Sequence, residues 1–434
     1  METQLAPSFV DSVYSDLTTL LGQDHWELKP NIQQVVNARN RLLPYLNESR
    51  QQILTNLIKS KIQQEADKAH RAAGRWGMIC NATGTGKSKI AINMAEKLVN
   101  YKSDAHILLV VPTEKLRDNN WRDEFEQWNN YSIYCNNIKR MCYKSISKMK
   151  GYKFDLVILD ECHNLSEKQS EFFQSNEVAA LIALTATKPK KAAKKLIFER
   201  LNINLVYEIT LDEAVDLGVI APYEITVVSV PLDSRNRYIK AGSLARPFYQ
   251  TEKANYEFFI KWEHSPERMS EILYRKRMHF IYNLKSKTEA AKQILLRIPP
   301  KKRIVIFCGS TEQADALSGC TYHSKSLSDD CYEDFKNMQV DIMACVNSVN
   351  EGHNLPFVDL GLVVQVNSND LHFIQRLGRI VRYRPGHIGR FIVLVAEGTV
   401  DVTWLNEALR ELNPERIRRI KFSDLIEGKE VLTF

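Results

Sequence analysis

The stretch NATGTGKSKIAINMAEKL, residues 81–98, places two glycines, a lysine and a serine directly before a segment with helical character. The apolar run GMIC precedes it, so the order is strand, glycine loop and helix. Glycines let the backbone approach phosphate oxygens closely, and a helix N-terminus supplies free N–H groups and positive potential. The stretch therefore predicts a phosphate-binding loop, although a glycine-rich turn that merely caps a helix would look the same in isolation.

The residues of this loop are candidate nucleotide ligands. Lys87 can neutralise β- and γ-phosphates, and the Ser88 hydroxyl can coordinate Mg²⁺. The pattern departs from the general one because Asn81 stands where a first glycine is expected. The candidate nucleotide-binding residues are Asn81, Ala82, Thr83, Gly84, Thr85, Gly86, Lys87 and Ser88.

A second element, KFDLVILDECHNL at residues 153–165, ends an apolar strand with two carboxylates. Ligands of open α/β sheets bind beyond the carboxyl ends of the strands, which is where Asp160 and Glu161 fall. We expect Asp160 to share the Mg²⁺ with Ser88, and Glu161 to orient and deprotonate an attacking water. A solvated acid pair at a helix cap is the alternative for an isolated Asp-Glu.

Strand-like and helical runs alternate twice along the 434 residues, which predicts an α/β protein with two parallel sheets. No apolar run reaches the ~18 residues that a membrane-spanning helix needs, and no basic and apolar leader opens the chain. The expected parts are a helical segment at 1–75, a first domain at 76–222, a second at 223–425 and a tail at 426–434. A helical insertion is expected at about 233–300, inside the second domain.

Cysteine usage and net charge limit the possible partners and settings. The eight cysteines include no CxxC pair, which argues against zinc or an iron–sulfur cluster. Several lie in strand-like runs, where cysteine is usually a core residue, so a reducing, cytoplasmic setting fits. The net charge of +7 is weak support for a polyanionic partner.

The run DECH at 160–163, downstream of ATGTGKS, resembles the DExH helicases of superfamily 2. Within that superfamily, the chain is most similar to phage-encoded DNA helicases and restriction-type motor domains. The resemblance implies that His163 connects the nucleotide site to the second domain. LTAT at 184–187 is similar to the third motif of the family, so Thr185 and Thr187 would couple hydrolysis to movement.

The run QRLGRIVR at 375–382 resembles the sixth motif of the superfamily. If it is helical, Gln375, Arg379 and Arg382 share one face, although a basic surface helix would have the same pattern. By the resemblance, both arginines would touch the γ-phosphate and Gln375 would contact the nucleotide or couple the domains. A motif V-like run upstream contributes Gly352 and Asn354 as further nucleotide candidates, and Asn354 replaces the aspartate of many relatives.

Two further runs are candidates for binding a nucleic-acid backbone. VVPTEKLRDNNW at 110–121 looks like motif Ia, with Pro112 and Thr113 after a buried strand. In YKSISK, Lys144 and Ser145 suit a phosphate, although a solvated basic turn is equally compatible with this run. Gln51 or Gln52 could serve as the adenine-reading glutamine of many relatives, although both match that motif poorly and an exposed helical glutamine is the alternative.

The resemblance implies two RecA-like domains in tandem that hydrolyse ATP with Mg²⁺ and act on nucleic acid. A DNA helicase or translocase is the first hypothesis, since DECH and the lack of a DEAD-box glutamine motif favour DNA. An RNA helicase and an ATP-driven switch that clamps or anneals strands are the alternatives. Protein partners, such as those of a restriction-like complex, have no support in the sequence.

Overall fold

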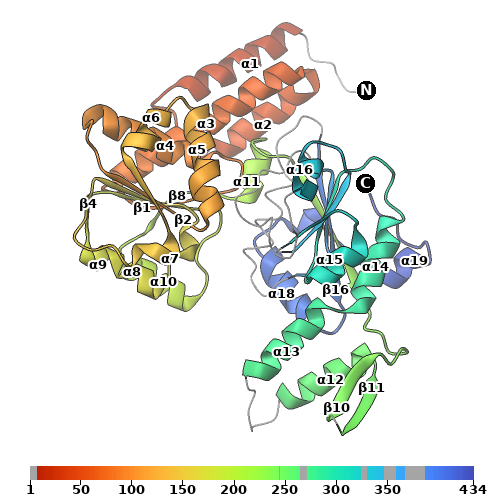
Figure 1. Ribbon diagram of the computed structural model, residues 1–434. Helices are drawn as coiled ribbons and strands as arrows, with labels where there is room; N and C mark the ends of the chain where they lie inside the picture. The colour runs from red at the N-terminus through yellow and green to blue at the C-terminus, as the bar shows by residue number, and fades with distance from the viewer. Residues whose placement is uncertain (1–6, 244, 264–270, 324–329, 347–357, 367–386) are drawn as a thin grey trace. The chain divides into compact units, whose positions relative to one another are not determined.

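The computed structural model describes residues 7–243, 245–263, 271–323, 330–346, 358–366 and 387–434. They form two compact units, which divide after Pro222, apart from a short stretch at residue 387 that groups with the first unit (Figure 1). Among these residues, no helix combines the length and apolar character that a membrane span requires.

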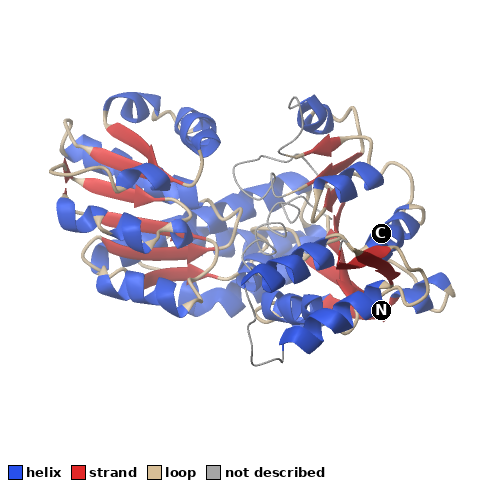
Figure 2. Cartoon of the chain, turned by 60° about the horizontal axis from the view of Figure 1, so that its bottom comes forward, coloured by secondary structure: helices blue, strands red, loops and turns tan. Residues whose placement is uncertain are grey.

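The first unit is built on a six-stranded parallel sheet with strand order β3-β2-β5-β7-β1-β8. Strands β2, β5 and β7 are buried at every position, as expected when helices cover both faces of a sheet. Figure 2 shows helices on both sides of this sheet. The strands are β1 (Trp76–Asn81), β2 (Ile107–Val111), β3 (Ile138–Cys142), β5 (Leu156–Leu159), β7 (Leu181–Thr185) and β8 (Leu205–Ile209).

Helices α4 to α6 lie on one face of this sheet and α7 to α10 on the other (Figure 1). The helices are α4 (Lys87–Tyr101), α5 (Trp121–Gln127), α6 (Tyr131–Asn136), α7 (Tyr143–Ile146), α8 (Glu167–Ser170), α9 (Phe172–Ser175), α10 (Ala192–Arg200) and α11 (Leu211–Asp216). A short parallel pair, β4 (Lys153–Phe154) and β6 (Glu177–Val178), borders the sheet. Single turns of helix at Leu116–Asn120 and Cys162–Asn164 complete the unit.

The helical N-terminal segment expected from the sequence is present as α1 (Pro7–Gly22), α2 (Ile32–Leu42) and α3 (Glu48–Ala72). Helix α3 packs against β1, β8 and α4. Its buried Glu65 accepts hydrogen bonds from the backbone N–H groups of Leu28 and Lys29 and from the Tyr207 hydroxyl of β8. This single carboxylate therefore fastens the N-terminal helices to the edge of the sheet.

The second unit holds a seven-stranded parallel sheet with strand order β13-β14-β12-β15-β16-β9-β17. Strands β9 and β16 pair along their full lengths, from Tyr223 opposite Gly389 to Val230 opposite Ala396. The two parallel sheets confirm the α/β class with tandem domains. The strands are β9 (Tyr223–Val230), β12 (Ile304–Phe307), β13 (Thr321–Tyr322), β14 (Ile342–Cys345), β15 (Leu360–Val363), β16 (Gly389–Ala396) and β17 (Ile417–Lys421).

Five helices flank this sheet, and three of them, α14, α15 and α19, share one apolar core with its strands. They are α14 (Lys285–Leu295), α15 (Thr311–Leu317), α16 (Asp330–Lys336), α18 (Val400–Leu409) and α19 (Phe422–Ile426). The insertion contains the expected helices, α12 (Glu252–Glu263) and α13 (Glu271–Tyr282). It also contains an antiparallel hairpin, β10 (Ile239–Ser243) and β11 (Arg246–Gln250), which the sequence analysis did not predict.

A fully buried ion pair joins two helices of the second unit. Lys287 of α14 donates to an Asp401 oxygen of α18 at 2.6 Å, and both side chains have no exposed surface. Gln365, just beyond β15, accepts from Lys287 at 2.5 Å and donates to Asp401 at 3.0 Å. The third Asp401 contact is the Ala396 backbone N–H, which donates at 3.1 Å. Every partner in this network is satisfied, which is the condition under which a buried charge pair is tolerated.

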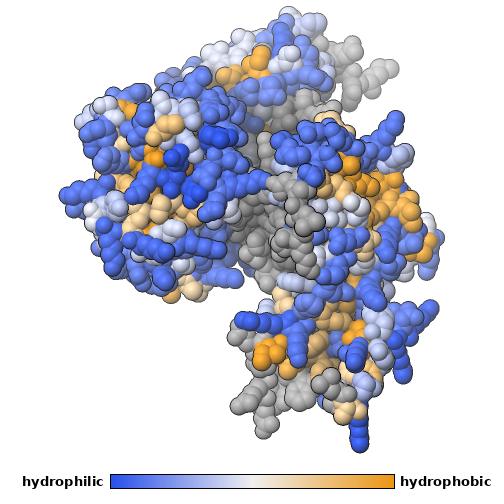
Figure 3. Space-filling model, viewed as in Figure 1, coloured by the Kyte–Doolittle hydropathy of each residue, from blue (hydrophilic) through white to orange (hydrophobic). Residues whose placement is uncertain are grey.

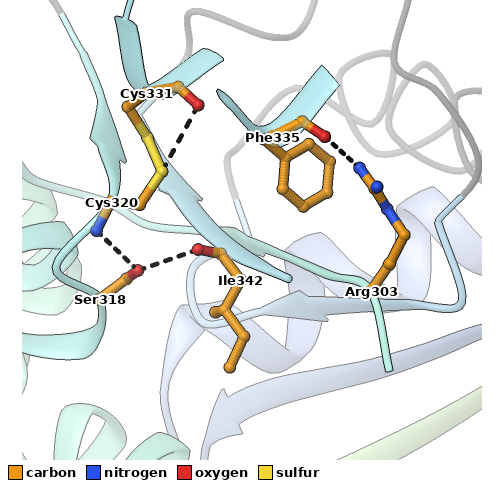
Figure 4. The surroundings of a disulfide bond; sticks show 6 residues. All are labelled: Arg303, Ser318, Cys320, Cys331, Phe335 and Ile342. Atoms are coloured by element: carbon orange, nitrogen blue, oxygen red, sulfur yellow. Dashed lines mark hydrogen bonds between the residues drawn. A yellow bond between two sulfur atoms is a disulfide. The ribbon is translucent and has the colours of Figure 1, made fainter. Parts of the chain in front are cut away.

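The second unit also contains a disulfide between Cys320 and Cys331, whose Cα atoms lie 5.4 Å apart (Figure 4). The expectation that several cysteines are core residues is met by Cys80, Cys142, Cys162, Cys308 and Cys345, which are buried thiols. Nothing in the spacing of the sequence had indicated the bonded pair.

Candidate functional site

The loop between β1 and α4 has the backbone of a phosphate cradle. Gly84 and Gly86 have φ angles of +91° and +88°, a region that side chains disfavour. Gly86 is also the N-cap of α4, so the free N–H groups of that helix start beside it. A Cβ atom at Gly86 would collide with the Gln63 side chain of α3. The positive φ angles therefore favour glycine at both positions, and a side chain at Gly86 would also displace the end of the Gln63 side chain.

Asn81, the departure from the usual motif, has a structural role. Its side-chain oxygen accepts from the backbone N–H of Ile209 at 3.0 Å and so ties the loop to β8. Its carbonyl accepts from the Lys87 ammonium at 2.9 Å. The Lys87 side chain therefore lies folded back over the loop, at the place where phosphates would be bound.

The carboxylates lie at the same edge of the sheet. β5 and β1 are separated only by β7, and Asp160 and the loop residues follow their carboxyl ends. One Asp160 oxygen accepts from the Glu161 backbone N–H at 3.0 Å, and the other accepts from the Trp121 indole N–H at 2.9 Å. The Asp160 carbonyl accepts from the Tyr143 hydroxyl at 2.9 Å. Three hydrogen bonds thus fix the orientation of this residue.

Burial and the neighbouring Glu161 raise the pKa of Asp160 to about 6. The Trp121 hydrogen bond and the positive charge of Lys87 oppose this rise. A carboxylate whose charge is disfavoured by its surroundings gains more than an exposed one when a cation binds beside it. Glu161 itself has a left-handed backbone with a φ of +46°, a strained conformation of the kind that often occurs at functional sites.

His163, the last residue of the DECH run, contacts both the acid pair and the LTAT run. Its Nδ1 atom is 3.4 Å from a Glu161 oxygen and 3.3 Å from the Thr185 hydroxyl. Thr185 in turn donates to the Thr187 carbonyl at 2.9 Å and accepts from the Thr187 N–H at 3.2 Å. One chain of contacts therefore runs from the acid pair through the histidine to the turn after β7.

The candidates for backbone binding lie at the same sheet edge. Pro112 and Thr113 directly follow β2, and Lys144 and Ser145 lie in α7, which follows β3. Thr113 and Lys144 are exposed, while Pro112 and Ser145 are partly exposed. Gly352, Asn354, Gln375, Arg379 and Arg382 lie outside the described residues.

Sequence reasoning missed three residues of this site. Trp121 and Tyr143 are buried aromatic residues whose polar atoms contact Asp160, and Gln63 lies 3.5 Å from the Thr85 carbonyl. The signal was present for two of them, because buried tryptophan and tyrosine usually direct their polar atom at a partner. Gln51 donates to Leu46 and Gln52 to Asn56, so neither reaches the loop through these contacts.

The donor set fits a nucleotide bound with a divalent cation. The Asn81 amide nitrogen and the Thr187 hydroxyl are buried and find no hydrogen-bond partner among the residues that the structure describes. Buried polar atoms of this kind usually have a partner, so a ligand at this edge would satisfy them. A lysine, a serine hydroxyl and a carboxylate at one edge match the ligands that Mg²⁺ and phosphates take.

Comparisons with known proteins find family models and a relative that are similar to this chain. Residues 44–190 match the family model described as the Type III restriction enzyme res subunit. Residues 286–384 match the helicase conserved C-terminal domain. The DNA 3'-5' translocase XPB2 of Sulfurisphaera tokodaii is 26% identical over 379 residues, which cover 80% of this chain and 84% of that protein.

Solved structures share the fold. The restriction-modification enzyme LlaBIII bound to DNA superimposes with a TM-score of 0.55 at 16% identity, over 85% of this chain. The match covers only 32% of LlaBIII. Dbp5 of S. cerevisiae, bound to RNA and ADP BeF3, gives a TM-score of 0.55 at 14% identity, over 85% of this chain and 91% of that one.

Proposed function

The chain belongs to the superfamily 2 helicases, which are ATP-hydrolysing motors acting on nucleic acid, and from this premise we propose that its track is DNA. The single observation that carries the motor function is the shared sheet edge of the first unit. There, the phosphate loop, Asp160 and Glu161, and two candidate segments for binding a nucleic-acid backbone follow neighbouring strands.

In the proposed ATP site, the loop from Asn81 to Ser88 holds the phosphates and Lys87 neutralises their charge. Ser88 and Asp160 would hold Mg²⁺, which supplies positive charge against the phosphate oxygens. Glu161 positions the attacking water and receives its proton. His163 contacts Glu161, so it would respond when the charge of that carboxylate changes. Thr185 and Thr187 would couple this response to movement of the protein.

Residues of the later motifs would complete the reaction. Arg379 and Arg382 are proposed to stabilise charge on the γ-phosphate, an effect that is worth about 10³ to 10⁵ in rate in other nucleotidases. Gln375, Gly352 and Asn354 would contact the nucleotide. Substituting either arginine with alanine should lower kcat strongly while ATP affinity changes little.

Three observations support DNA over RNA. XPB2 is named a DNA translocase and aligns over most of this chain. The run DECH and the poor match to a glutamine motif favour DNA, as set out above.

Pro112, Thr113, Lys144 and Ser145 would bind the backbone, so the binding should be independent of sequence and weaken strongly with salt. We propose that the protein acts in the cytoplasm, where both ATP and nucleic acid are accessible.

ATP turnover measured side by side with single-stranded DNA, duplex DNA, forked DNA and RNA tests this proposal. DNA should stimulate turnover more than RNA does. Greater stimulation by RNA would reject the DNA track, and no stimulation by any polymer would reject the motor. A strand-displacement assay run with ATP and with a non-hydrolysable analogue separates a translocating motor from a clamping or annealing switch, which would not need hydrolysis.

A further inference from the structure

The insertion carries a charge that the rest of the chain lacks. Residues 233–300 hold fourteen lysines and arginines against seven aspartates and glutamates, so they account for the whole net charge of +7. The remaining residues are therefore balanced. A positive potential confined to one segment attracts a polyanion to that segment.

Within the insertion, the positive charge is concentrated on the hairpin and its approach. Residues 234–251 contain Arg235, Arg237, Lys240 and Arg246 and no acidic residue. All four basic residues are exposed. The adjacent Phe248 and Tyr249 of β11 are also exposed, at 54% and 58%. Figure 3 shows hydrophobic and hydrophilic residues interleaved over the insertion.

The strand register combines a ring with a cation on each face of the hairpin. Successive residues of a strand point to opposite faces, so Phe248 shares its face with Arg246, two residues away. Tyr249 lies opposite Lys240 in the register and shares the other face with it. Gly242 and Pro247, which pair beside them, offer little side chain to cover either ring.

Hydrogen bonds hold the base of the hairpin against α12 and the start of α14. The Tyr238 hydroxyl donates to the buried carboxylate of Glu252 on α12. Glu252 also accepts from the backbone N–H groups of Asp233 at 3.0 Å and Ser286 at 3.1 Å. Figure 1 shows the two strands beside α12. A hairpin with a fixed base and exposed rings does not need to be ordered again when a ligand binds.

We propose that the β10–β11 hairpin is a binding surface for unpaired nucleic acid, on which Phe248 and Tyr249 stack with bases while Lys240 and Arg246 contact phosphates. The inference rests on the proposed function, because it assumes a nucleic-acid track. Exposed aromatic rings bind the π-faces of splayed bases, which are covered inside a duplex. The hairpin therefore favours a single strand over a double one.

Binding of a fluorescein-labelled oligothymidylate, followed by anisotropy, tests the surface against a duplex of the same length. The double variant Phe248→Ala/Tyr249→Ala should bind the single strand at least tenfold more weakly, while duplex affinity falls less than twofold. Tyr101→Ala, which removes a ring that is 91% exposed in the first unit, is the matched control and should bind like the wild type. Phe248→Trp/Tyr249→Trp should keep the affinity and show quenching of tryptophan fluorescence by the oligonucleotide.

Unchanged single-strand affinity in the double alanine variant would overturn the inference and leave a protein partner as the occupant of the rings. An equal loss for duplex would also overturn it, because the rings would then not distinguish a single strand from a double one. The substituted side chains are exposed, so the thermal unfolding midpoint should not move. The inference and the proposed function fail in different ways. DNA-stimulated turnover with normal single-strand binding by the variant rejects only the hairpin, whereas a wild-type enzyme that no polymer stimulates rejects the motor.

Discussion

Each unit contains an aspartate that the fold holds in place, and the two have opposite surroundings. Asp401 of the second unit has no exposed surface and is neutralised by Lys287 at 2.6 Å, with Gln365 and a backbone N–H completing its contacts. Asp160 of the first unit is partly accessible and is oriented by hydrogen bonds, and it forms no ion pair with any residue that the structure describes. A carboxylate whose charge is fully compensated supports the fold, whereas one that is oriented but not compensated can bind a cation.

Removing the charge of Asp160 tests this comparison most directly. Asp160→Asn should abolish ATP turnover, because the amide is a poor Mg²⁺ ligand, yet it should not lower the free energy of unfolding. Lys87→Ala should abolish turnover as well. Steady-state ATP hydrolysis and urea denaturation measure both effects, and wild-type turnover in either variant would contradict the assignment of the site.

The corresponding change in the second unit should act on stability. Lys287→Met leaves Asp401 buried without its counter-charge, which typically costs about 3–5 kcal/mol. We expect a loss of this size in the urea unfolding of the second unit. The double variant Lys287→Met/Asp401→Leu should recover much of it, because no buried charge remains. A single variant as stable as the wild type would show that the ion pair does not support the fold.

A smaller effect is expected from the residue that orients Asp160. Trp121→Phe keeps an aromatic ring but removes the indole N–H, and hydrogen bonds to charged groups contribute about 1.5–3 kcal/mol. The Mg²⁺ concentration for half-maximal turnover should therefore rise at least tenfold. Trp76→Phe is the control, because that indole donates to the Leu201 carbonyl at the same 2.9 Å. Equal effects of the two substitutions would indicate general loosening of the unit.

The smallest expected effect comes from pH. Since the pKa of Asp160 is raised to about 6, a proton competes with Mg²⁺ for this carboxylate below that pH, and the Mg²⁺ requirement should increase. The same protonation should increase the free energy of unfolding. The pKa of Asp160 is near 3.8 in the unfolded chain and about 6 in the folded one. Between these two pH values the folded chain binds one proton more than the unfolded chain, so Asp160 favours folding as the pH falls. The difference between wild type and Asp160→Asn isolates this contribution.

The sequence predicted the elements whose pattern is local. The phosphate loop, the acid pair after an apolar strand and the buried strands of both sheets each depend on neighbouring residues. The predicted roles of Arg379 and Arg382 remain predictions. β17 was missed because IRRIK is a charged strand at the sheet edge, and β13 has only two residues. The hairpin was missed because Gly242 and Pro247 interrupt the strand pattern.

Contacts between distant parts of the chain could not be predicted. Trp121 and Asp160 are 39 residues apart, and the bond between them depends on β2 and β5 being neighbours in the sheet. Lys287 and Asp401 are 114 residues apart, and nothing near either residue indicates its partner. Strand order decides such pairs, and a single sequence does not encode strand order in any local pattern.

The disulfide described above makes the reactive thiols of the two units distinguishable. While Cys320 and Cys331 are bonded, Cys135 of the first unit is the exposed free thiol among the eight cysteines, all of which the structure describes. A maleimide dye should therefore label the first unit alone, and mild reduction should then open the second unit to another dye. Energy transfer between the two labels would follow movement of the units during each round of hydrolysis.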